Sequence, residues 1–114
     1  PSLRHGWGGW VFNDAATGEV VGRGGLAEAD IEGRREDELA DAIRPDRWGE
    51  GLGTAVGQVA VNHARRHLDA DSLVAFTVPD NARSLRVMAK LGFVFESEIE
   101  HAGLPQVLYR LALR

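Results

Sequence analysis

The stretch RPDRWGEGLGT, residues 44–54, decides the fold. Three alternating glycines, Gly49, Gly51 and Gly53, stand directly ahead of a run with helical spacing, AVGQVAVNHARRHL. Because glycine has no Cβ, the backbone can turn sharply here and come close to a ligand. The first turn of a helix also presents free N–H groups and about half a positive charge. The stretch therefore predicts an anion site at the start of a helix, and the anion we expect is a phosphate group.

Upstream of the glycines the pattern is that of strands. Two short apolar runs, residues 9–12 and 19–26, flank the turn-forming sequence NDAATG and predict a β-hairpin. Residues 27–37 form a polar segment with a second turn at Gly33, and residues 38–43 (ELADAI) predict a third strand. This third strand is weakly β-prone, because it contains two alanines and an aspartate.

Downstream of the glycines we expect a helix near residues 53–68, followed by a strand over 72–78. The strand, SLVAFTV, is continuously apolar, as a buried central strand would be. One face of the helix collects residues at helical spacing: Val56, Val59, Ala60, His63, Ala64 and Leu68.

A second helix is predicted near residues 82–91, after the breaking and capping residues Pro79, Asp80 and Asn81. It places Leu85, Met88 and Ala89 on one stripe and ends at Gly92, a good residue for a helix C-terminus.

Residues 93–100 and 107–114 predict a final hairpin joined by the loop HAGLPQ. The element order is therefore β-β-β-α-β-α-β-β, an α+β domain of the α/β type, with two helices flanking one mixed sheet.

Composition narrows the class of protein. At 114 residues, 44% hydrophobic and 26% charged, the sequence fits a single globular domain. The net charge of −4 argues against nucleic acid as the main partner, and no apolar run approaches the roughly 18 residues of a membrane span. The sequence contains no cysteine, which fits a reducing cytoplasm and excludes a disulfide scaffold, a thiolate nucleophile and a cysteine-ligated metal.

Two motifs together carry a family resemblance. RPDRWGEGLGT and NARSLRVMAKLGF, residues 81–93, separated by a buried strand, resemble the GNAT superfamily of acetyl-CoA-dependent N-acetyltransferases over residues 9–113. More narrowly, the two motifs resemble the Rim-type branch, which includes the ribosomal-protein N-terminal acetyltransferases. Full-length members begin with a further strand and two helices, and this sequence, which begins with Pro1, starts at about the second strand of that plan.

The resemblance implies transfer of an acetyl group from acetyl-CoA to a primary amine, by direct attack in a ternary complex. The acceptor would be a protein or peptide N-terminus or a small molecule. Dimers are common in this branch, so the resemblance also makes a homodimer possible, whereas the expected cytoplasmic location rests on the absence of cysteine. A donor to the thioester oxygen is expected from a backbone N–H near residues 42–43. No metal is implied, although His63 and His67 have the spacing of a two-histidine face.

Coenzyme A would lie along the two motifs. Backbone N–H groups of Trp48 to Thr54 would surround its diphosphate, and the Thr54 hydroxyl would add a contact. The residues expected to contact the cofactor are Ala42, Ile43, Arg44, Trp48, Gly49, Glu50, Gly51, Leu52, Gly53, Thr54, Asn81, Ser84 and Lys90. Arg83, Arg86 and Lys90 could also reach its 3′-phosphate, or form a solvated helix face.

Acetyl transfer requires a neutral amine, so a base must remove a proton from an ordinary alkylammonium group. By resemblance, Glu38 is the first candidate for this general base, Asp41 the second and Glu28 the third. The alternative is that these carboxylates are solvated or salt-bridged.

The departing thiolate needs a proton donor. Many GNAT enzymes have a tyrosine where this sequence has Met88, which cannot donate a proton. Ser84 is therefore the first candidate for the acid, as in Rim-type relatives, and Tyr109 is another. His101, in the loop of the last hairpin, could line the acceptor site.

Two other functions remain open at this point. Met88 and the missing N-terminal elements motivate a non-catalytic acyl-CoA-binding or dimerisation module. A nucleotide-binding module is disfavoured, because the glycines read G-x-G-x-G rather than G-x-G-x-x-G and no P-loop lysine follows.

Overall fold

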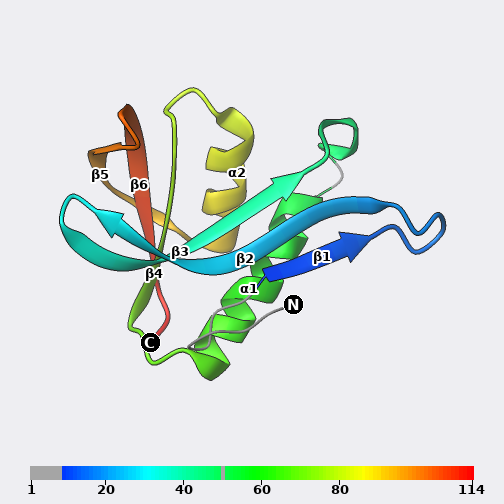
Figure 1. Ribbon diagram of the computed structural model, residues 1–114, viewed down its shortest axis with the longest axis horizontal. Helices are drawn as coiled ribbons and strands as arrows, with labels where there is room; N and C mark the ends of the chain where they lie inside the picture. Colours follow the sequence, from blue (N-terminus) through cyan, green and yellow to red (C-terminus); the bar gives the residue numbers. More distant parts are fainter. Residues whose placement is uncertain (1–8, 50) are drawn as a thin grey trace.

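One mixed sheet of six strands, in the order β1-β2-β3-β4-β6-β5, organises the chain (Figure 1). The computed structural model describes residues 9–49 and 51–114. Strands β3 and β4 are parallel, whereas all other neighbours pair antiparallel. The elements are β1 (Gly9–Asn13), β2 (Val20–Ile31), β3 (Arg34–Ile43), the 3₁₀ turn η1 (Pro45–Arg47), α1 (Leu52–His67), β4 (Ser72–Thr77), α2 (Ala82–Leu91), β5 (Val94–His101) and β6 (Leu104–Ala112). The predicted fold class and the order of strands and helices are confirmed.

Both helices pack on one face of the sheet. Their apolar sides share a buried core with Leu39 on β3 and Leu73 on β4. Gly57 lets α1 approach α2, because a Cβ there would stand 2.5 Å from Leu91 Cδ1. Gly24 on β2 likewise leaves room for Val56 of α1, because the Val56 Cγ1 lies 2.2 Å from the position that a Cβ on Gly24 would occupy. These glycines hold α1 close to the sheet and to α2.

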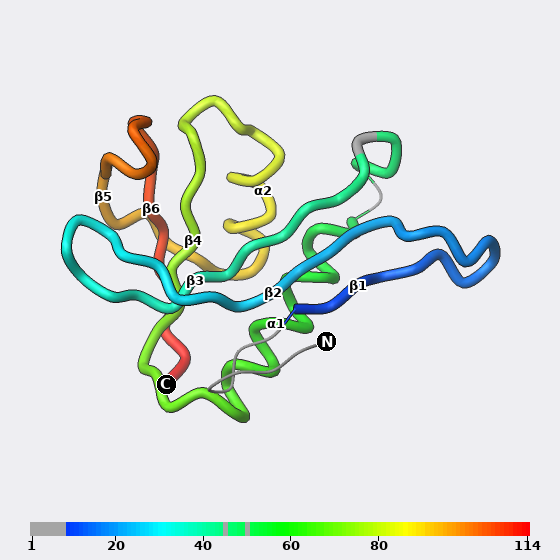
Figure 2. The backbone as a smooth tube through the Cα atoms, viewed as in Figure 1, coloured from blue at the N-terminus to red at the C-terminus, as the bar shows by residue number. Residues whose placement is uncertain are grey.

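The opposite face carries a smaller apolar cluster, formed by Ile31, Val74, Ile99 and Leu108. Ile31 comes from the far end of β2, because the β2–β3 hairpin is long and its tip lies beside β5 (Figure 2). There the Glu100 backbone N–H donates to the Glu32 carboxylate at 3.4 Å. The tip of the β2–β3 hairpin thus contacts the edge strand β5 on this face of the sheet.

Strands β3 and β4 meet at a single residue pair, Glu38 and Val74, and then diverge (Figure 1). We call this boundary the seam. Arg110 on β6 crosses it, donating to Glu36 on β3 at 2.9 and 3.0 Å and to the Ser72 hydroxyl on β4 at 2.7 Å. The same guanidinium donates to Glu96 on β5. The sheet is therefore open at one end of the seam and tied by side chains at the other.

Several sequence-based expectations were wrong in detail. The segment 27–37, expected to be polar and outside strands, belongs to β2 and β3 except for the turn at Glu32 and Gly33. Residues 104–106, expected in a loop, begin β6. Val59 is 40% exposed and Val61 takes its place in the core, because the buried stripe of α1 runs through Val56, Ala60, Val61 and Ala64. Ala89 on α2 is exposed, whereas Leu91 is buried.

None of the helices in the described ranges has the length and hydropathy that a membrane-spanning helix requires.

Candidate functional site

The glycine-rich turn leaves the start of α1 open. Gly49 and Gly51 have φ angles of 87° and 78°, in the left-handed region that favours glycine. Gly51 is the N-cap of α1; no side chain caps the helix there, and its first turn contains no acidic residue. As far as the described residues show, the first amides of the helix, at Leu52, Gly53 and Thr54, therefore keep their hydrogen-bonding capacity for a ligand. The turn for which the sequence predicts an anion site therefore has an open geometry, and the anion itself stays a prediction.

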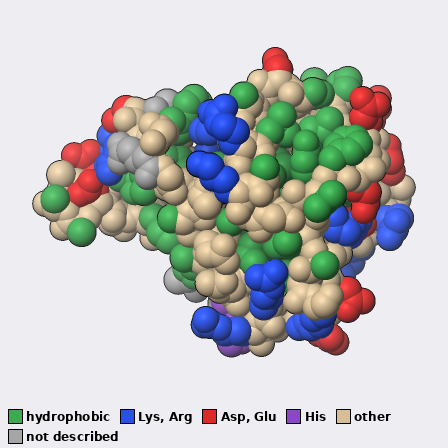
Figure 3. Space-filling view, turned by 180° about the vertical axis from the view of Figure 1, so that it is seen from behind, with side chains coloured by type: hydrophobic (Ala, Val, Ile, Leu, Met, Phe, Trp, Pro, Cys, Tyr) green, Lys and Arg blue, Asp and Glu red, His purple; other side chains and the backbone are tan. Residues whose placement is uncertain are grey.

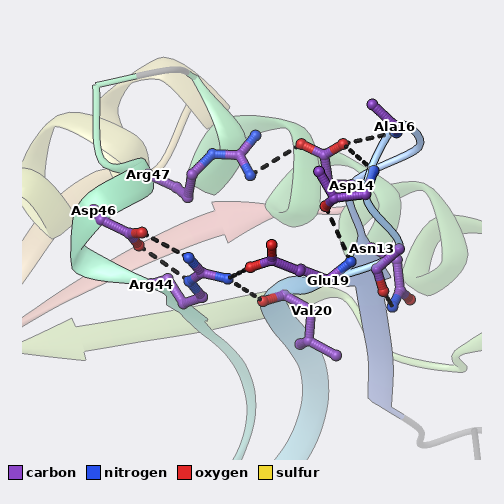
Figure 4. A network of polar contacts seen from close by, with 10 residues as sticks. Asn13, Asp14, Ala16, Glu19, Val20, Arg44, Asp46 and Arg47 are labelled. Atoms are coloured by element: carbon purple, nitrogen blue, oxygen red, sulfur yellow. Dashed lines mark hydrogen bonds and ion pairs between the residues drawn. The ribbon is translucent and has the colours of Figure 1, made fainter.

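Side chains outside the turn fix its position. Arg44 donates to Asp46 at 2.6 and 3.0 Å and to Glu19 at 2.8 Å (Figure 4). Arg47 forms an ion pair of 3.1 Å with Asp14 in the β1–β2 hairpin. The indole N–H of Trp48 donates to the Ile43 carbonyl at 2.9 Å. These contacts tie the turn to the first hairpin and the end of β3.

A basic pocket, which we call the phosphate pocket, lies over the start of α1. Four cationic residues line it together with the glycine turn: Arg47 from η1, and Arg83, Arg86 and Lys90 from α2. Figure 3 shows one group of basic side chains in the upper centre of this view and others along its lower part and right side, with acidic side chains mostly toward the edges. Open amides and several cations on one pocket are the properties that phosphate groups require.

A second pocket, which we call the seam pocket, lies where β3 and β4 diverge. It is lined by Glu38 and Phe76, which share the face of the smaller cluster, and by residues of the helical face such as Asp41. It therefore reaches both faces of the sheet. Arg83 lines both pockets and stands at their junction.

Glu38 lies in the seam pocket with its carboxyl largely removed from water. Burial raises the pKa of Glu38, and the nearby His101 partly opposes that rise. His101 itself packs against Phe76, with ring centroids 4.7 Å apart. A carboxylate with a raised pKa at the mouth of a pocket is suited to accept a proton.

Asp41 lies deeper, between the two pockets. Burial raises the pKa of Asp41, and Arg83 opposes the rise. Its Oδ2 is buried and has no hydrogen-bond partner among the described residues. The nearest cation is Arg83 Nη1 at 3.7 Å, beyond hydrogen-bonding distance, and we describe the contact as an ion pair. The same guanidinium lies 5.2 Å from the centre of the Trp48 ring.

The start of α2 forms another wall of the seam pocket. Asn81 Oδ1 caps the helix by accepting from the Ser84 backbone N–H at 3.2 Å, and Asn81 Nδ2 donates to the Thr77 hydroxyl at 3.1 Å. Ser84 and Met88 line the same pocket. Met88 is only 6% exposed and presents a thioether, which has no proton to donate.

The structure brings most predicted site residues together in two connected pockets. Glu38, Asp41, Asn81 and Ser84 line the seam pocket. The phosphate pocket is lined by Ile43, Trp48, Gly49, Gly51, Leu52, Gly53, Thr54 and Lys90. Glu50 lies outside the described residues.

Four expected residues lie elsewhere. Ala42 lines neither pocket, and the Arg44 side chain is turned toward the first hairpin. Glu28 pairs with Arg35 at 2.7 Å, and Tyr109 packs against Phe95. Sequence reasoning missed several lining residues, among them Arg47, Phe76 and Val87. Of these, only Arg47 had a visible signal, a cation directly ahead of the glycine turn.

Comparisons with known proteins agree with this architecture. A family model described as an acetyltransferase (GNAT) domain matches residues 2–94. Spermidine N(1)-acetyltransferase of Escherichia coli (strain K12) is 30% identical over 97 residues, which cover 85% of this chain and 52% of that protein. The chain spans about half the length of the curated relatives it matches.

Two solved structures illustrate the likeness of the fold. The yncA structure from Salmonella typhimurium, determined with its cofactor acetyl-CoA, superposes with a TM-score of 0.81 at 23% identity, covering 96% of this chain and 66% of that one. The ribosomal-protein-S5-alanine acetyltransferase from Vibrio fischeri gives a TM-score of 0.77 at 20% identity, covering 93% and 61%.

Proposed function

The chain belongs to the acetyltransferase (GNAT) domain family, and we propose that it transfers an acetyl group from acetyl-CoA to a primary amine. The observation that carries the proposal is the open start of α1 facing a basic pocket that continues into the seam pocket. Acetyl-CoA supplies the acetyl group as an activated thioester. The phosphate pocket fits its diphosphate, because a Cβ is absent at Gly49 and Gly51 and cations surround the free amides.

Within this proposal the seam pocket holds the reacting groups. Glu38 accepts a proton from the acceptor amine, directly or through water, and the neutral amine then attacks the acetyl carbon. A C–N bond forms and the C–S bond breaks, and the second proton that the nitrogen loses as the amide forms passes through the Ser84 hydroxyl to the departing sulfur. Ser84 is the donor we propose for that proton, because it lies on the same pocket and Met88 cannot serve.

The acceptor is proposed from the relatives' names. A spermidine acetyltransferase and a ribosomal-protein-S5-alanine acetyltransferase are among the proteins it resembles. We therefore propose a polyamine-like small molecule or a protein N-terminus. The Rim-type branch and a homodimer belong to the same proposal and rest on the sequence motifs, and the proposed cytoplasmic location rests on the absence of cysteine.

The activity test is direct. The protein is incubated with acetyl-CoA and an amine panel containing spermidine and a peptide with an N-terminal alanine, and thiol release is followed. We expect turnover with at least one acceptor. Absence of turnover across the panel, together with tight binding of coenzyme A, would instead support the non-catalytic acyl-CoA-binding module, which Met88 favours.

A matched pair of variants tests the phosphate pocket. Gly51→Asp places a carboxylate at the start of α1, whereas Gly18→Asp makes the same change in the first hairpin. Both glycines have positive φ and open space around them, so the backbone strain is comparable. We expect coenzyme A to raise the melting temperature of wild type and Gly18→Asp but not of Gly51→Asp. An unchanged shift in Gly51→Asp would refute the pocket assignment.

A further inference from the structure

Arg83 stands where the phosphate pocket and the seam pocket meet. Its Nη1 lies 3.1 Å from the position that a Cβ on Gly53 would occupy, so the guanidinium lies over the first turn of α1. Arg86 and Lys90 lie farther along α2. Arg83 is therefore the cation placed beside the open amides, where a diphosphate would bind.

A cation at this place opposes the helix dipole, whose positive end lies at the start of α1. This unfavourable interaction is offset by the attraction of the Arg83 guanidinium to the Asp41 carboxylate, 3.7 Å away, and to the ring of Trp48. Both side chains of the ion pair are 19% exposed. The pair is loose, because the buried Asp41 Oδ2 receives no hydrogen bond from it. A diphosphate that accepts charge-assisted hydrogen bonds from the guanidinium would be a stronger partner for Arg83 than this carboxylate at 3.7 Å.

Few other charges act on Asp41. Glu38 lines the same seam pocket, and Arg47, Arg86 and Lys90 line the phosphate pocket. The residues of β4 on the seam pocket, Ala75 to Thr77, carry no ionisable group, and the first turn of α1 has no acidic residue. Among the described residues, Arg83 is the cation that forms an ion pair with the Asp41 carboxylate, at 3.7 Å.

We propose that Arg83 and Asp41 form an exchangeable ion pair: Asp41 holds the guanidinium over the start of α1 in the empty protein, and the diphosphate of coenzyme A replaces the carboxylate as its partner. Arg83 is then a diphosphate-binding residue, and Asp41 is a positioning residue that competes with the ligand. This inference rests on the proposed function for the identity of the ligand. It assigns Arg83 to the diphosphate rather than to the 3′-phosphate.

The exchange predicts opposite signs for two variants. Arg83→Gln removes charge-assisted hydrogen bonds to the diphosphate, and we expect it to weaken coenzyme A binding about tenfold. Asp41→Asn removes the competing carboxylate, and we expect it to tighten binding about threefold or more. In the double variant the gain from Asp41→Asn should disappear, because in this proposal Asp41 competes with the ligand only through its pairing with Arg83.

Titration calorimetry with coenzyme A, dephospho-coenzyme A and pantetheine tests these expectations. Arg83→Gln should weaken the first two ligands equally, because both contain the diphosphate, and leave pantetheine binding unchanged. Two controls make the same charge changes elsewhere: Arg66→Gln at the far end of α1, and Asp37→Asn on the same strand as Asp41 but outside both pockets. We expect both controls to bind coenzyme A as wild type does.

Three results would overturn the exchange: wild-type affinity in Arg83→Gln, an effect of Arg83→Gln confined to coenzyme A with its 3′-phosphate, or weaker binding in Asp41→Asn. An equal gain from Asp41→Asn with and without Arg83 would also overturn it, since simple repulsion would then suffice. In each of these cases the wild type still binds coenzyme A. Failure of the proposed function is seen differently, as absent turnover or absent binding by wild type.

Discussion

At the scale of single residues, two neighbouring carboxyls on β3 receive different environments. Glu38 and Asp41 are both desolvated, and burial raises the pKa of each. Asp41 has an arginine 3.7 Å away, whereas the charged group that acts on Glu38 is the imidazole of His101. Glu38 is therefore the better proton acceptor of the two, and Asp41 the better partner for a fixed cation.

Replacing Glu38 tests its role as base. Glu38→Gln keeps the size and polarity of the side chain but cannot accept the proton, so we expect kcat to fall about 100-fold with little change in KM for acetyl-CoA. Steady-state kinetics with the best acceptor of the panel measure this. Glu98→Gln, an exposed glutamate on β5, is the control and should retain activity. A kcat within about twofold of wild type in Glu38→Gln would exclude the assignment.

The pH dependence follows from His101. The base must be ionised, so kcat/KM falls as the pH drops through the pKa of Glu38, which burial holds above its ordinary value near 4.3. The positive charge of His101 lowers this pKa, and its removal raises it further. We therefore expect the acidic limb of the pH–rate profile to move to higher pH in His101→Ala. His67→Ala, on the exposed end of α1, should leave the limb in place.

At the scale of elements, the sequence predicted best where local chemistry alone fixes the outcome. The end of α2 at Gly92, in the left-handed region at φ 95°, and the cap by Asn81 were both predictable. The polar residues 27–31 and 34–37 were not, because their strand conformation depends on pairing with each other across the hairpin. The predicted burial of Val59 was wrong for a related reason. Helix α1 has apolar residues on more than one side, and its packing against the sheet and α2 selects the side that is buried.

The candidate site was likewise predictable only where a single stretch of sequence determines it. The glycine turn and the two motifs could be read from spacing, whereas the role of Arg83 could not. Its position between Asp41, Trp48 and Gly53 arises from three separate elements, β3, the glycine turn and α2. No pattern within one stretch of sequence contains that information.

The cap of α2 gives a prediction at this scale. Asn81→Ala removes the bond to the Ser84 N–H and the bond to Thr77, and we expect the free energy of unfolding to fall by about 1 kcal/mol. Urea denaturation measures the change. Asn62→Ala, in the middle of α1, removes only a contact with an exposed Gln58 and should be nearly neutral. Equal stabilities of the two variants would contradict the capping role.

At the scale of the whole molecule, stability depends on the side-chain contacts that connect β3 to β4, β5 and β6 across the seam. Arg110 holds β3 and β5 through Glu36 and Glu96, and burial keeps the Glu36 side chain only 12% exposed. Arg110→Met leaves that carboxylate without its main partner, so we expect a loss of roughly 1–3 kcal/mol in unfolding free energy. Arg34→Met is the matched control, because Arg34 lies 3.8 Å from the same glutamate but is 78% exposed. Thermal or urea unfolding should show almost no loss for Arg34→Met.

The seam also divides the chain in sequence. Residues 9–67 contain β1 to β3 and α1, residues 72–114 contain β4, α2, β5 and β6, and the backbone passes between them once, through 68–71. A cut in that connection would leave two continuous fragments, each with its own strands and one helix. Apolar burial between α1 and α2 and the Arg110 contacts would remain to bring them together. The fold is thus suited to fragment complementation, in which binding of coenzyme A or the proposed acetyl transfer would report that two separately expressed pieces have met.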